Sequence, residues 1–270
     1  MLKKELSDII ATWRARLIIL FVICIPVYDF FTKVWGQYSY YWSDPASYPN
    51  GLYPDEIYHP AMAAFLSGGE LDHTPQMLLE WLLPIWCLLM CGDFYVREYR
   101  SGYVPVVSVR AKQTEIFLAK NLAGFIVMFS TMALSLLLNY ILCGIAFRGG
   151  TSFRGLEMLV GDMGWLFDIS LTYPELTYLL YIFLFSIVAG ILCCICISLS
   201  FLLCSYKLLY SVCFILWFVL ICLPNNIIYV IQPFTEYGLS YMLSGLGTFL
   251  VVAALAIGIG YIRKVKYETI

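Results

Sequence analysis

Few side chains in this sequence of 270 residues could do acid–base or metal chemistry. The two histidines, His59 and His73, lie in one hydrophilic segment with acids nearby, but their spacing fits no metal motif. Glu80 lies in the apolar run QMLLEWLLPIW, and Asp29 lies four residues before Lys33, a spacing that lets the two pair on one helical face. Neither carboxyl group has the second group that general acid–base catalysis requires. An enzyme acting within a membrane is therefore the least favoured interpretation.

The sequence motifs of nucleotide-binding and hydrolytic enzymes are missing. There is no G-x-x-x-x-G-K-[ST] loop, no H-E-x-x-H and no G-x-S-x-G. The ten cysteines all lie in or at the ends of apolar runs, where we expect small buried hydrophobic residues rather than disulfides. Cys193 and Cys196 form a C-x-x-C without a nearby histidine or carboxylate. We therefore predict no catalytic residue, metal or cofactor in this chain.

The composition predicts an all-α integral membrane protein. Hydrophobic residues make up 61% of the chain and charged residues 13%, whereas soluble domains contain about a quarter charged residues. A helix of about 20 apolar residues crosses the hydrocarbon core of about 30 Å. Six apolar segments would give six transmembrane helices in a single transmembrane domain over residues 1–270. They span approximately 17–35, 76–92, 117–147, 177–203, 207–231 and 243–262.

Basic residues are distributed unevenly over the hydrophilic connections. Thirteen of the sixteen lie in segments 1–16, 93–116, 204–207 and 263–270 or at Lys120. Lys and Arg are retained on the cytoplasmic side of short loops, which predicts a multi-pass protein of a cell membrane with both termini in the cytoplasm. Residues 36–75 then form an extracellular loop. The missing signal-peptide cleavage site and the cysteine content fit a bacterial membrane.

The N-terminal stretch LKKELSDIIATWRAR follows the spacing of an amphipathic helix. Such a helix would lie in the membrane interface. The alternative is a basic flank that only orients the first span. The apolar face would hold Leu2, Leu6, Ile9, Ile10 and Trp13, and the polar face Lys3, Lys4, Glu5, Asp8 and Thr12.

Two other segments depart from regular spans. Pro224-Asn225-Asn226 and Pro233 break the apolar pattern, so residues 223–241 are predicted to form broken, re-entrant helices between the fifth and sixth spans. Residues 36–75 are dense in tyrosine, which predicts an aromatic belt at the membrane surface; the alternative is a surface that guides or gates a substrate.

Intramembrane charges are candidates for a substrate pathway, since a charge in hydrocarbon costs a few kcal/mol unless it is paired or hydrated. Glu80 and Asp29 are the candidates here. Both lie near the outer surface, where snorkelling costs little, so a purely structural role is the alternative.

The stretch between the second and third segments, GDFYVREYRSGYVPVVSVRAKQTEIFLAKN, gathers five basic residues against three acidic ones. Gly102 and Pro105 predict turns, and AKQTEIFLAKN begins a helix that continues into the third span. A short helix flanked by charges suits the docking of another protein, because charged contacts set the register around an apolar centre. We therefore predict a docking element within 93–116.

The chain resembles the membrane (permease) subunit of type-2 ATP-binding-cassette (ABC) exporters. That family has six spans, an amphipathic helix before the first, a cytoplasmic coupling helix between spans 2 and 3, and re-entrant helices between spans 5 and 6. Val109 departs from a proline that relatives often carry, and the first outer loop is long. The loose coupling motif matches Asp93, Arg97, Glu98, Gly102, Arg110 and Lys120. The resemblance assigns ATPase coupling to Asp93, Arg97, Glu98, Arg100, Gly102, Arg110 and Lys112.

The resemblance also implies partners and a cargo. Two permease chains, identical or paralogous, would form the pathway for an amphipathic or hydrophobic peptide, antimicrobial, toxin or lipid. Separate ATPase subunits would bind ATP and Mg and dock on the coupling loop; membrane lipid, but no nucleic acid, would be a further partner. Glu98→Ala and Arg110→Ala are expected to uncouple transport from ATP hydrolysis without unfolding the protein. The alternative is a membrane-embedded sensory or scaffold protein whose aromatic outer loop binds a ligand.

Overall fold

The computed structural model describes residues 1–67, 74–104, 112–159, 161, 164–234 and 238–267, and this part of the chain is helical. It contains no β-strand, only one isolated bridge between Tyr58 and Ser152. The all-α prediction is confirmed. The helices are α1 (Leu2–Ala11), α2 (Trp13–Ser43), α3 (Pro60–Ala63), α4 (Thr74–Trp81), α5 (Leu83–Cys87), α6 (Phe94–Arg100), α8 (Gln113–Ala146), α9 (Trp165–Thr172), α10 (Pro174–Ser200), α11 (Tyr206–Cys222), α12 (Ile228–Ile231) and α13 (Leu239–Ile262). Short π-helical segments are Leu88–Gly92 and Arg263–Tyr267, and Leu156–Leu159 is a 3-10 turn.

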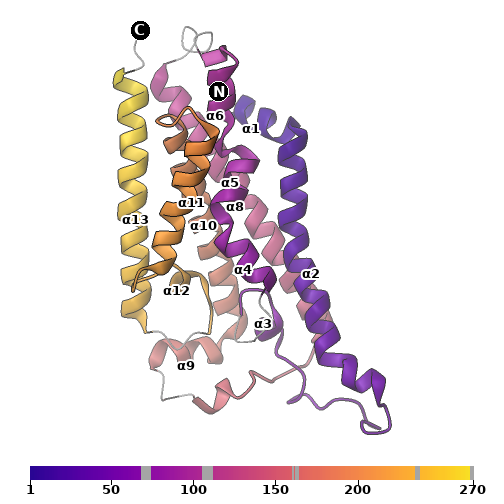
Figure 1. The fold of residues 1–270 in the computed structure, drawn as a ribbon. Coiled ribbons are helices and arrows are strands. Elements are labelled where there is room, and N and C mark those ends of the chain that lie inside the picture. The colour runs from indigo at the N-terminus through magenta and orange to yellow at the C-terminus, as the bar shows by residue number, and fades with distance from the viewer. Residues whose placement is uncertain (68–73, 105–111, 160, 162–163, 235–237, 268–270) are drawn as a thin grey trace.

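Four of these helices are long and apolar enough to cross a membrane: α2, α8, α10 and α13 (Figure 1). The helix pair α4 and 83–92 is a fifth candidate, although it is bent by 59°. Helix α11 has 17 residues, or about 26 Å, slightly short of the hydrocarbon core. It ends at Cys222 rather than at the predicted residue 231, because Leu223 precedes a proline and takes extended backbone. The protein thus has four to five candidate spans by length and composition.

The bend in the second apolar segment follows from Pro84 at the start of α5. Proline has no N–H, so the main-chain carbonyl of Glu80, four residues earlier, loses its helical donor. The indole Nε1–H of Trp217 on α11 donates to that carbonyl at 2.8 Å. A side chain from another helix therefore supplies the bond that the bend removes, as an apolar setting requires.

A second proline, Pro26, lies inside α2 and frees the carbonyl of Val22 in the same way. Here Ser135 of α8 donates its Oγ–H to the Val22 carbonyl at 3.0 Å. Asn139, one turn further along α8, donates to the Pro26 carbonyl at 2.6 Å. These bonds fix α2 against α8, although the two helices are far apart in the sequence.

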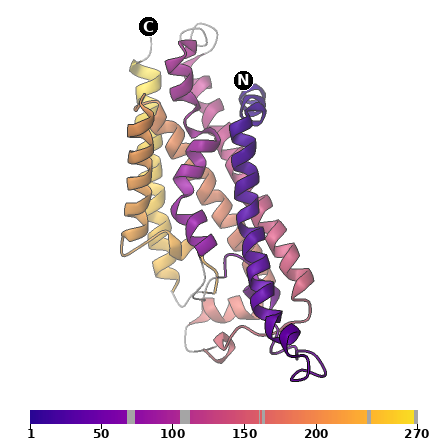
Figure 2. The same ribbon diagram turned by 45° about the vertical axis from the view of Figure 1, so that its right-hand side comes forward.

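Helix α10 lies at the centre of the bundle (Figures 1 and 2). Its most apolar stretch is 67% buried, against 39% or less for the other three long helices. Helix α13 approaches α10 closely at Gly260, where an added Cβ would lie 2.6 Å from the Ser198 carbonyl oxygen. The outer helices keep large apolar side chains exposed, such as Ile145 and Leu255, which suits contact with lipid rather than water.

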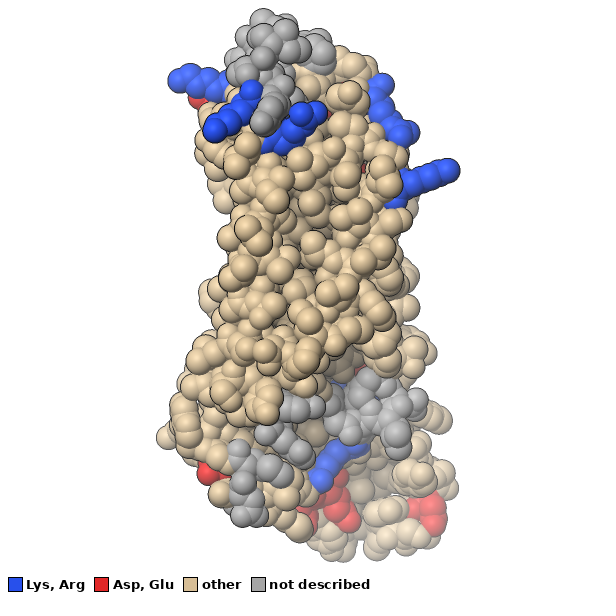
Figure 3. Space-filling model, turned by 60° about the vertical axis from the view of Figure 1, so that its left-hand side comes forward, with Lys and Arg blue, Asp and Glu red and all other residues tan. Residues whose placement is uncertain are grey.

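The two ends of the bundle differ in charge. In Figure 3, Lys and Arg gather at the end that holds both chain termini, and Asp and Glu gather at the opposite end. We call these the basic end and the acidic end. Helix α9 lies across the acidic end (Figures 1 and 2). The charge asymmetry of the sequence thus becomes an asymmetry of the fold.

Part of the predicted extracellular loop packs inside the acidic end. Residues 61–67 are all buried. The N–H of Phe65 donates to Asn139 Oδ1 at 2.9 Å, and the N–H of Leu66 donates to the Tyr178 hydroxyl at 3.1 Å. Buried irregular backbone needs such partners. The predicted loop therefore begins later, because α2 continues past residue 35, and it folds back into the bundle.

The segment after α11 also folds back against the bundle. It contains the short helix α12, with Ile227, Val230 and Ile231 buried. Its carbonyl at Asn226 would lie 2.5 Å from a Cβ added at Gly245 of α13, so the segment packs against α13. The predicted broken helices are present as this single short helix; residues 235–237 lie outside the described part of the chain.

Candidate functional site: a charged junction at the basic end

Two groups of buried ionic contacts hold the basic end together, and they include residues that were predicted to couple to an ATPase. They join α1, α2, α6, α8 and α11. We call them the charged junction, which consists of Glu5, Arg14, Asp93, Glu98, Lys120 and Tyr210.

The first group is centred on Asp93, the residue before α6. Both terminal guanidinium nitrogens of Arg14, on α2, donate to the two carboxylate oxygens, with an Nη1–Oδ2 distance of 3.0 Å. The hydroxyl of Tyr210 on α11 donates to the same Oδ2 at 2.9 Å. Asp93 is only 1% exposed. Because a buried, unpaired carboxylate costs several kcal/mol, these contacts fix the start of α6 against α2 and α11.

The second group is centred on Lys120 of α8, which is 7% exposed. Its Nζ lies 3.0 Å from Glu5 Oε2 on α1 and 2.9 Å from Glu98 Oε1 on α6. One ammonium group therefore pairs with two carboxylates from different helices. The N-terminal helix and the predicted coupling helix share one cation.

Helix α1 forms, but it ends at Ala11, so that Trp13 begins α2, and its faces differ from the prediction. Ile9 is buried, whereas Ile10 and Trp13 are 52% and 70% exposed. Glu5, expected on the polar face, turns inward because its carboxylate pairs with Lys120. These two exposed apolar side chains, one on α1 and one at the start of α2, suit a position at the membrane interface.

The outward face of the predicted coupling element is basic. Asp93 is buried and Glu98 half-buried, whereas four further predicted residues are exposed; Arg110 lies outside the described residues. The predicted set thus divides into acids that bind other helices of this chain and bases that face outward. The exposed members are Arg97, Arg100, Gly102 and Lys112.

Aromatic rings orient the two exposed arginines of α6. The Arg97 guanidinium lies 4.2 Å from the centre of the Phe94 ring, and that of Arg100 lies 4.7 Å from the centre of the Tyr206 ring. Cation–π contacts of this kind restrict the side chains without neutralising them. The arginines therefore remain available to an anionic partner surface.

The N-terminal helix α1 and the segment after α13 both make contacts at the basic end. Lys4 Nζ donates to the Tyr103 hydroxyl at 2.9 Å, a hydrogen bond that raises the pKa of Lys4. Lys264, after α13, is 1% exposed and lies 4.7 Å from the ring centre of Tyr95 and 5.5 Å from that of Phe201. Contacts from Lys4 on α1 and from Lys264 after α13 thus reach α6 and the residues that follow it.

The two intramembrane candidates lie outside the junction. Lys33 Nζ lies 3.1 Å from Asp29 Oδ2, which confirms the expected pairing, and it also donates to the Ala64 carbonyl at 3.3 Å. Glu80 is 5% exposed and accepts a hydrogen bond from Gln76 Nε2 at 3.0 Å. Each carboxyl group is thus bound by another side chain of this protein. Asp29 and Lys33 lie near the buried residues 61–67, and Glu80 lies at the bend of the second apolar segment.

Most of the ten cysteines lie inside the bundle. Cys24 and Cys222 are exposed, so the expectation that all ten cysteines are buried was wrong for these two, whose side chains face out of the bundle. Cys91 Sγ and Cys193 Sγ are 3.3 Å apart. Within the described residues, no three His, Cys, Asp or Glu side chains are placed to hold a metal ion.

His59 caps the short helix α3. Its Nδ1 accepts from the Ala61 N–H at 3.1 Å, and its ring stacks on Phe153 with 4.8 Å between centres. Burial lowers the pKa of His59, against an opposing effect of the Glu175 carboxylate. His73 lies outside the described residues.

Sequence reasoning missed Glu5, Arg14 and Tyr210 as members of the junction. The sequence separations explain this, since Arg14 and Asp93 are 79 residues apart and Glu5 and Lys120 are 115 apart. The sequence offered one signal: Glu5 is an acid in a basic, amphipathic N-terminal helix, and Lys120 is a base just inside an apolar run, so each needs a counterion.

Comparison with known proteins identifies a relative. No family model and no solved structure matches the chain. The chain is 33% identical over 211 residues to a Bacillus subtilis (strain 168) protein named "Uncharacterized protein YybM", and the match covers 78% of this chain and 84% of the Bacillus protein. The chain therefore belongs to the same protein family as YybM.

Proposed function

We propose that the protein is the permease subunit of an ABC exporter. In this proposal it crosses a bacterial cell membrane six times, with α11 and the bent α4 to 83–92 pair as the fifth and second spans and the basic end in the cytoplasm. With a second permease chain it forms the pathway for an amphipathic or hydrophobic cargo. A separate ATPase subunit binds ATP and Mg and docks on the element that begins at α6.

One observation carries the proposal: α6 is anchored on its inner side and basic on its outer side. Asp93 binds Arg14 of α2, and Glu98 binds Lys120 of α8. Arg97 and Arg100 face outward. A partner that pulls on α6 would move α2 with it, because opening the Arg14–Asp93 pair would leave the buried Asp93 carboxylate without its counterion. Lys120 in addition connects α6 to α8 and α1. This is what a coupling helix requires.

The difference in charge between the ends of the bundle supports the orientation. Basic residues are retained on the cytoplasmic side, and both termini lie at the basic end (Figure 1). The indole of Trp217 on α11 bonds to the second apolar segment, which supports the placing of the short α11 within the bundle as a span.

The proposal is tested by affinity purification of the tagged chain from its native membranes in mild detergent, with mass spectrometry of what co-purifies. We expect a P-loop ATPase in near-equal amount. Arg97→Glu and Arg100→Glu should reduce its recovery about tenfold or more, because charge reversal at the centre of an interface removes attraction and adds repulsion.

Lys3→Glu is the matched control, since Lys3 is also an exposed basic residue at the same end. It should leave recovery of the ATPase unchanged. If no ATPase co-purifies under conditions that preserve other membrane complexes, the permease proposal fails. A different stoichiometric partner that is lost in Arg97→Glu would instead favour a sensory or scaffold protein.

A further inference from the structure

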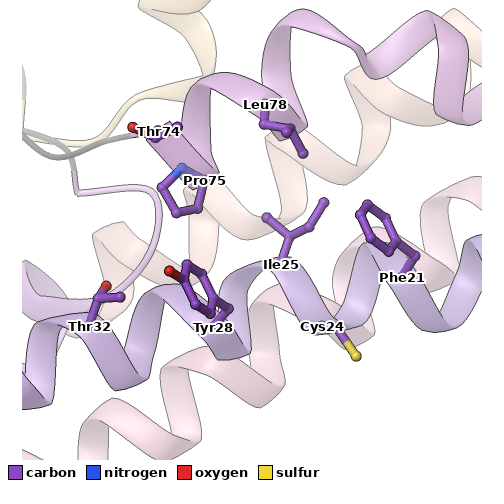
Figure 4. A pocket seen from close by; sticks show the side chains of 8 residues that line it. All are labelled: Phe21, Cys24, Ile25, Tyr28, Thr32, Thr74, Pro75 and Leu78. Carbon is purple, nitrogen blue, oxygen red and sulfur yellow. The ribbon is translucent and has the colours of Figure 1, made fainter.

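A lipid-exposed groove runs between α2 and α4 (Figure 4). Its volume is about 580 Å³, which falls within the range of ligand sites. Ile25 of α2 and Leu78 of α4 point toward each other across it, and Phe21 lies beside them. No residue that lines it in the described part of the chain carries a charge. The groove therefore suits a neutral, apolar occupant.

The bend of the second apolar segment sets the limits of the groove. The 59° bend turns α4 relative to the helix that follows it. Beyond the bend, Trp86 of α5 contacts Phe21 of α2, with 5.4 Å between ring centres. This aromatic pair bounds the groove on the side of the basic end, so an occupant has to enter sideways from the membrane.

The groove is polar at one end and apolar along the rest of its length. From Phe21 to Thr32 it follows eleven residues of α2, or about 16 Å, close to half of a hydrocarbon core of about 30 Å. Its hydroxyl groups, those of Tyr28, Thr32 and Thr74, all lie at the end nearer the acidic end of the bundle (Figure 4). One leaflet of a bilayer has the same order, with polar ester groups outside and hydrocarbon inside. The apolar part of the groove, from Tyr28 to Phe21, is about 10 Å long, enough for the part of an acyl chain nearest its ester.

Tyr28 offers a hydroxyl donor to an occupant of the groove. The Thr32 hydroxyl already donates to the Asp29 carbonyl at 2.7 Å. Tyr28 is 64% exposed, and its hydroxyl has no hydrogen-bond partner among the described residues. A phenol in an apolar environment is stabilised by a hydrogen-bond acceptor. The ester carbonyl of a lipid is such an acceptor.

We propose that this groove binds one acyl chain of a phospholipid from the leaflet at the acidic end, with an ester carbonyl of that lipid accepting from Tyr28. The hydrocarbon chain lies along Ile25 and Leu78 and ends at the Phe21–Trp86 pair. This site does not depend on the proposed export function, because it involves neither α6 nor the charged junction.

The test uses the full chain in nanodiscs of phosphatidylglycerol that contain a phosphatidylglycerol with a diazirine midway along one acyl chain. After photolysis, mass spectrometry of peptides locates the adducts. We expect enrichment on residues 21–28 and on α4 relative to α13, whose Ile259 is 53% exposed and does not line this groove. Leu78→Trp, which fills the groove, should abolish this enrichment. Met77→Trp, at a neighbouring exposed residue outside the groove, should retain it.

A conservative variant keeps the test decisive if Leu78→Trp folds poorly. Tyr28→Phe retains the ring and removes only the hydroxyl, so native mass spectrometry should show less co-purified phosphatidylglycerol than in the wild type. Adducts spread evenly over α2, α8 and α13 would mean ordinary boundary lipid and would overturn the proposal. If lipid adducts on residues 21–28 are missing and a thiol-specific cross-linker joins two chains through the exposed Cys24, the groove belongs to a second copy of this chain and the lipid proposal is overturned.

Discussion

The indole N–H of Trp217 donates to the main-chain carbonyl of Glu80 at 2.8 Å, and this is the carbonyl that Pro84 leaves without a helical donor. Trp217 is fully buried. Helix α11, although short, therefore completes the hydrogen bonding of a helix from which it is 137 residues distant in sequence. The bend is a built feature of the fold rather than a local weakness, because the unsatisfied group that it creates has a specific partner.

Trp217→Phe is expected to destabilise the protein by about 1–3 kcal/mol beyond the loss of ring volume, because it leaves the Glu80 carbonyl buried without a donor. Thermal unfolding in detergent measures the loss. Trp165→Phe is the control, since Trp165 is 62% exposed and should tolerate the change. Equal melting temperatures for wild type and Trp217→Phe would contradict the role given to the indole N–H.

Lys120→Met is expected to destabilise the basic end by about 3–5 kcal/mol, because it leaves the carboxylates of Glu5 and Glu98 facing each other without their cation. Glu5→Gln or Glu98→Gln alone should cost less, since Lys120 keeps one partner. Unfolding free energies of the single and double variants form the measurement. The double variant should lose more than the sum of the two single ones; additive losses would show that the two carboxylates do not share the lysine.

That shared cation bears on the expected uncoupling by Glu98→Ala. The variant should fold, because Glu5 remains paired with Lys120, yet α6 loses its connection to α8. ATPase activity without transport in the reconstituted complex would then separate a coupling role from a structural one. Loss of folded protein in Glu98→Ala, but not in Glu98→Gln, would assign Glu98 a purely structural role.

Tyr210→Phe and Asp93→Asn should differ in severity. Tyr210→Phe removes one hydrogen bond to a carboxylate that Arg14 still holds at both oxygens, so we expect a loss of about 1.5–3 kcal/mol. Asp93→Asn removes the charge that Arg14 and Tyr210 both bind and weakens all three hydrogen bonds, so it is expected to cost more than Tyr210→Phe. Chemical unfolding of both variants tests this order. A reversed order would mean that Tyr210, rather than Arg14, is the main partner of Asp93.

The sequence was sufficient for features that depend on local composition. Apolar length predicts where α8 and α10 lie to within a few residues, and the distribution of Lys and Arg predicts which connections share the basic end. It was also sufficient for the Asp29–Lys33 pair, because a spacing of four places both on one helical face. These predictions involve residues that are close in the chain.

Features that depend on helix packing could not be predicted in the same way. The burial of Glu5 follows from a lysine in a different helix, and the entry of residues 61–67 into the bundle follows from donors and acceptors supplied by Asn139 and Tyr178. Pro84 signals a bend, but nothing local indicates that Trp217 completes it. Each of these contacts joins residues that approach only after the spans have packed.

His59 predicts a response of the acidic end to pH. Burial lowers its pKa below the ordinary value of 6.5. The His59 imidazole therefore binds a proton more readily when the loop around it is unfolded than when the loop is folded. The loop is therefore fully stabilised above about pH 6.5 and loses stability as the pH falls through that value toward the lowered pKa. Chymotrypsin digestion of the tyrosine-rich segment should accelerate in this range. In His59→Asn, whose amide oxygen can still accept from the Ala61 N–H, the rate should lose that dependence relative to an unstructured reporter peptide. An unchanged pH profile in the variant would exclude His59 as the group responsible.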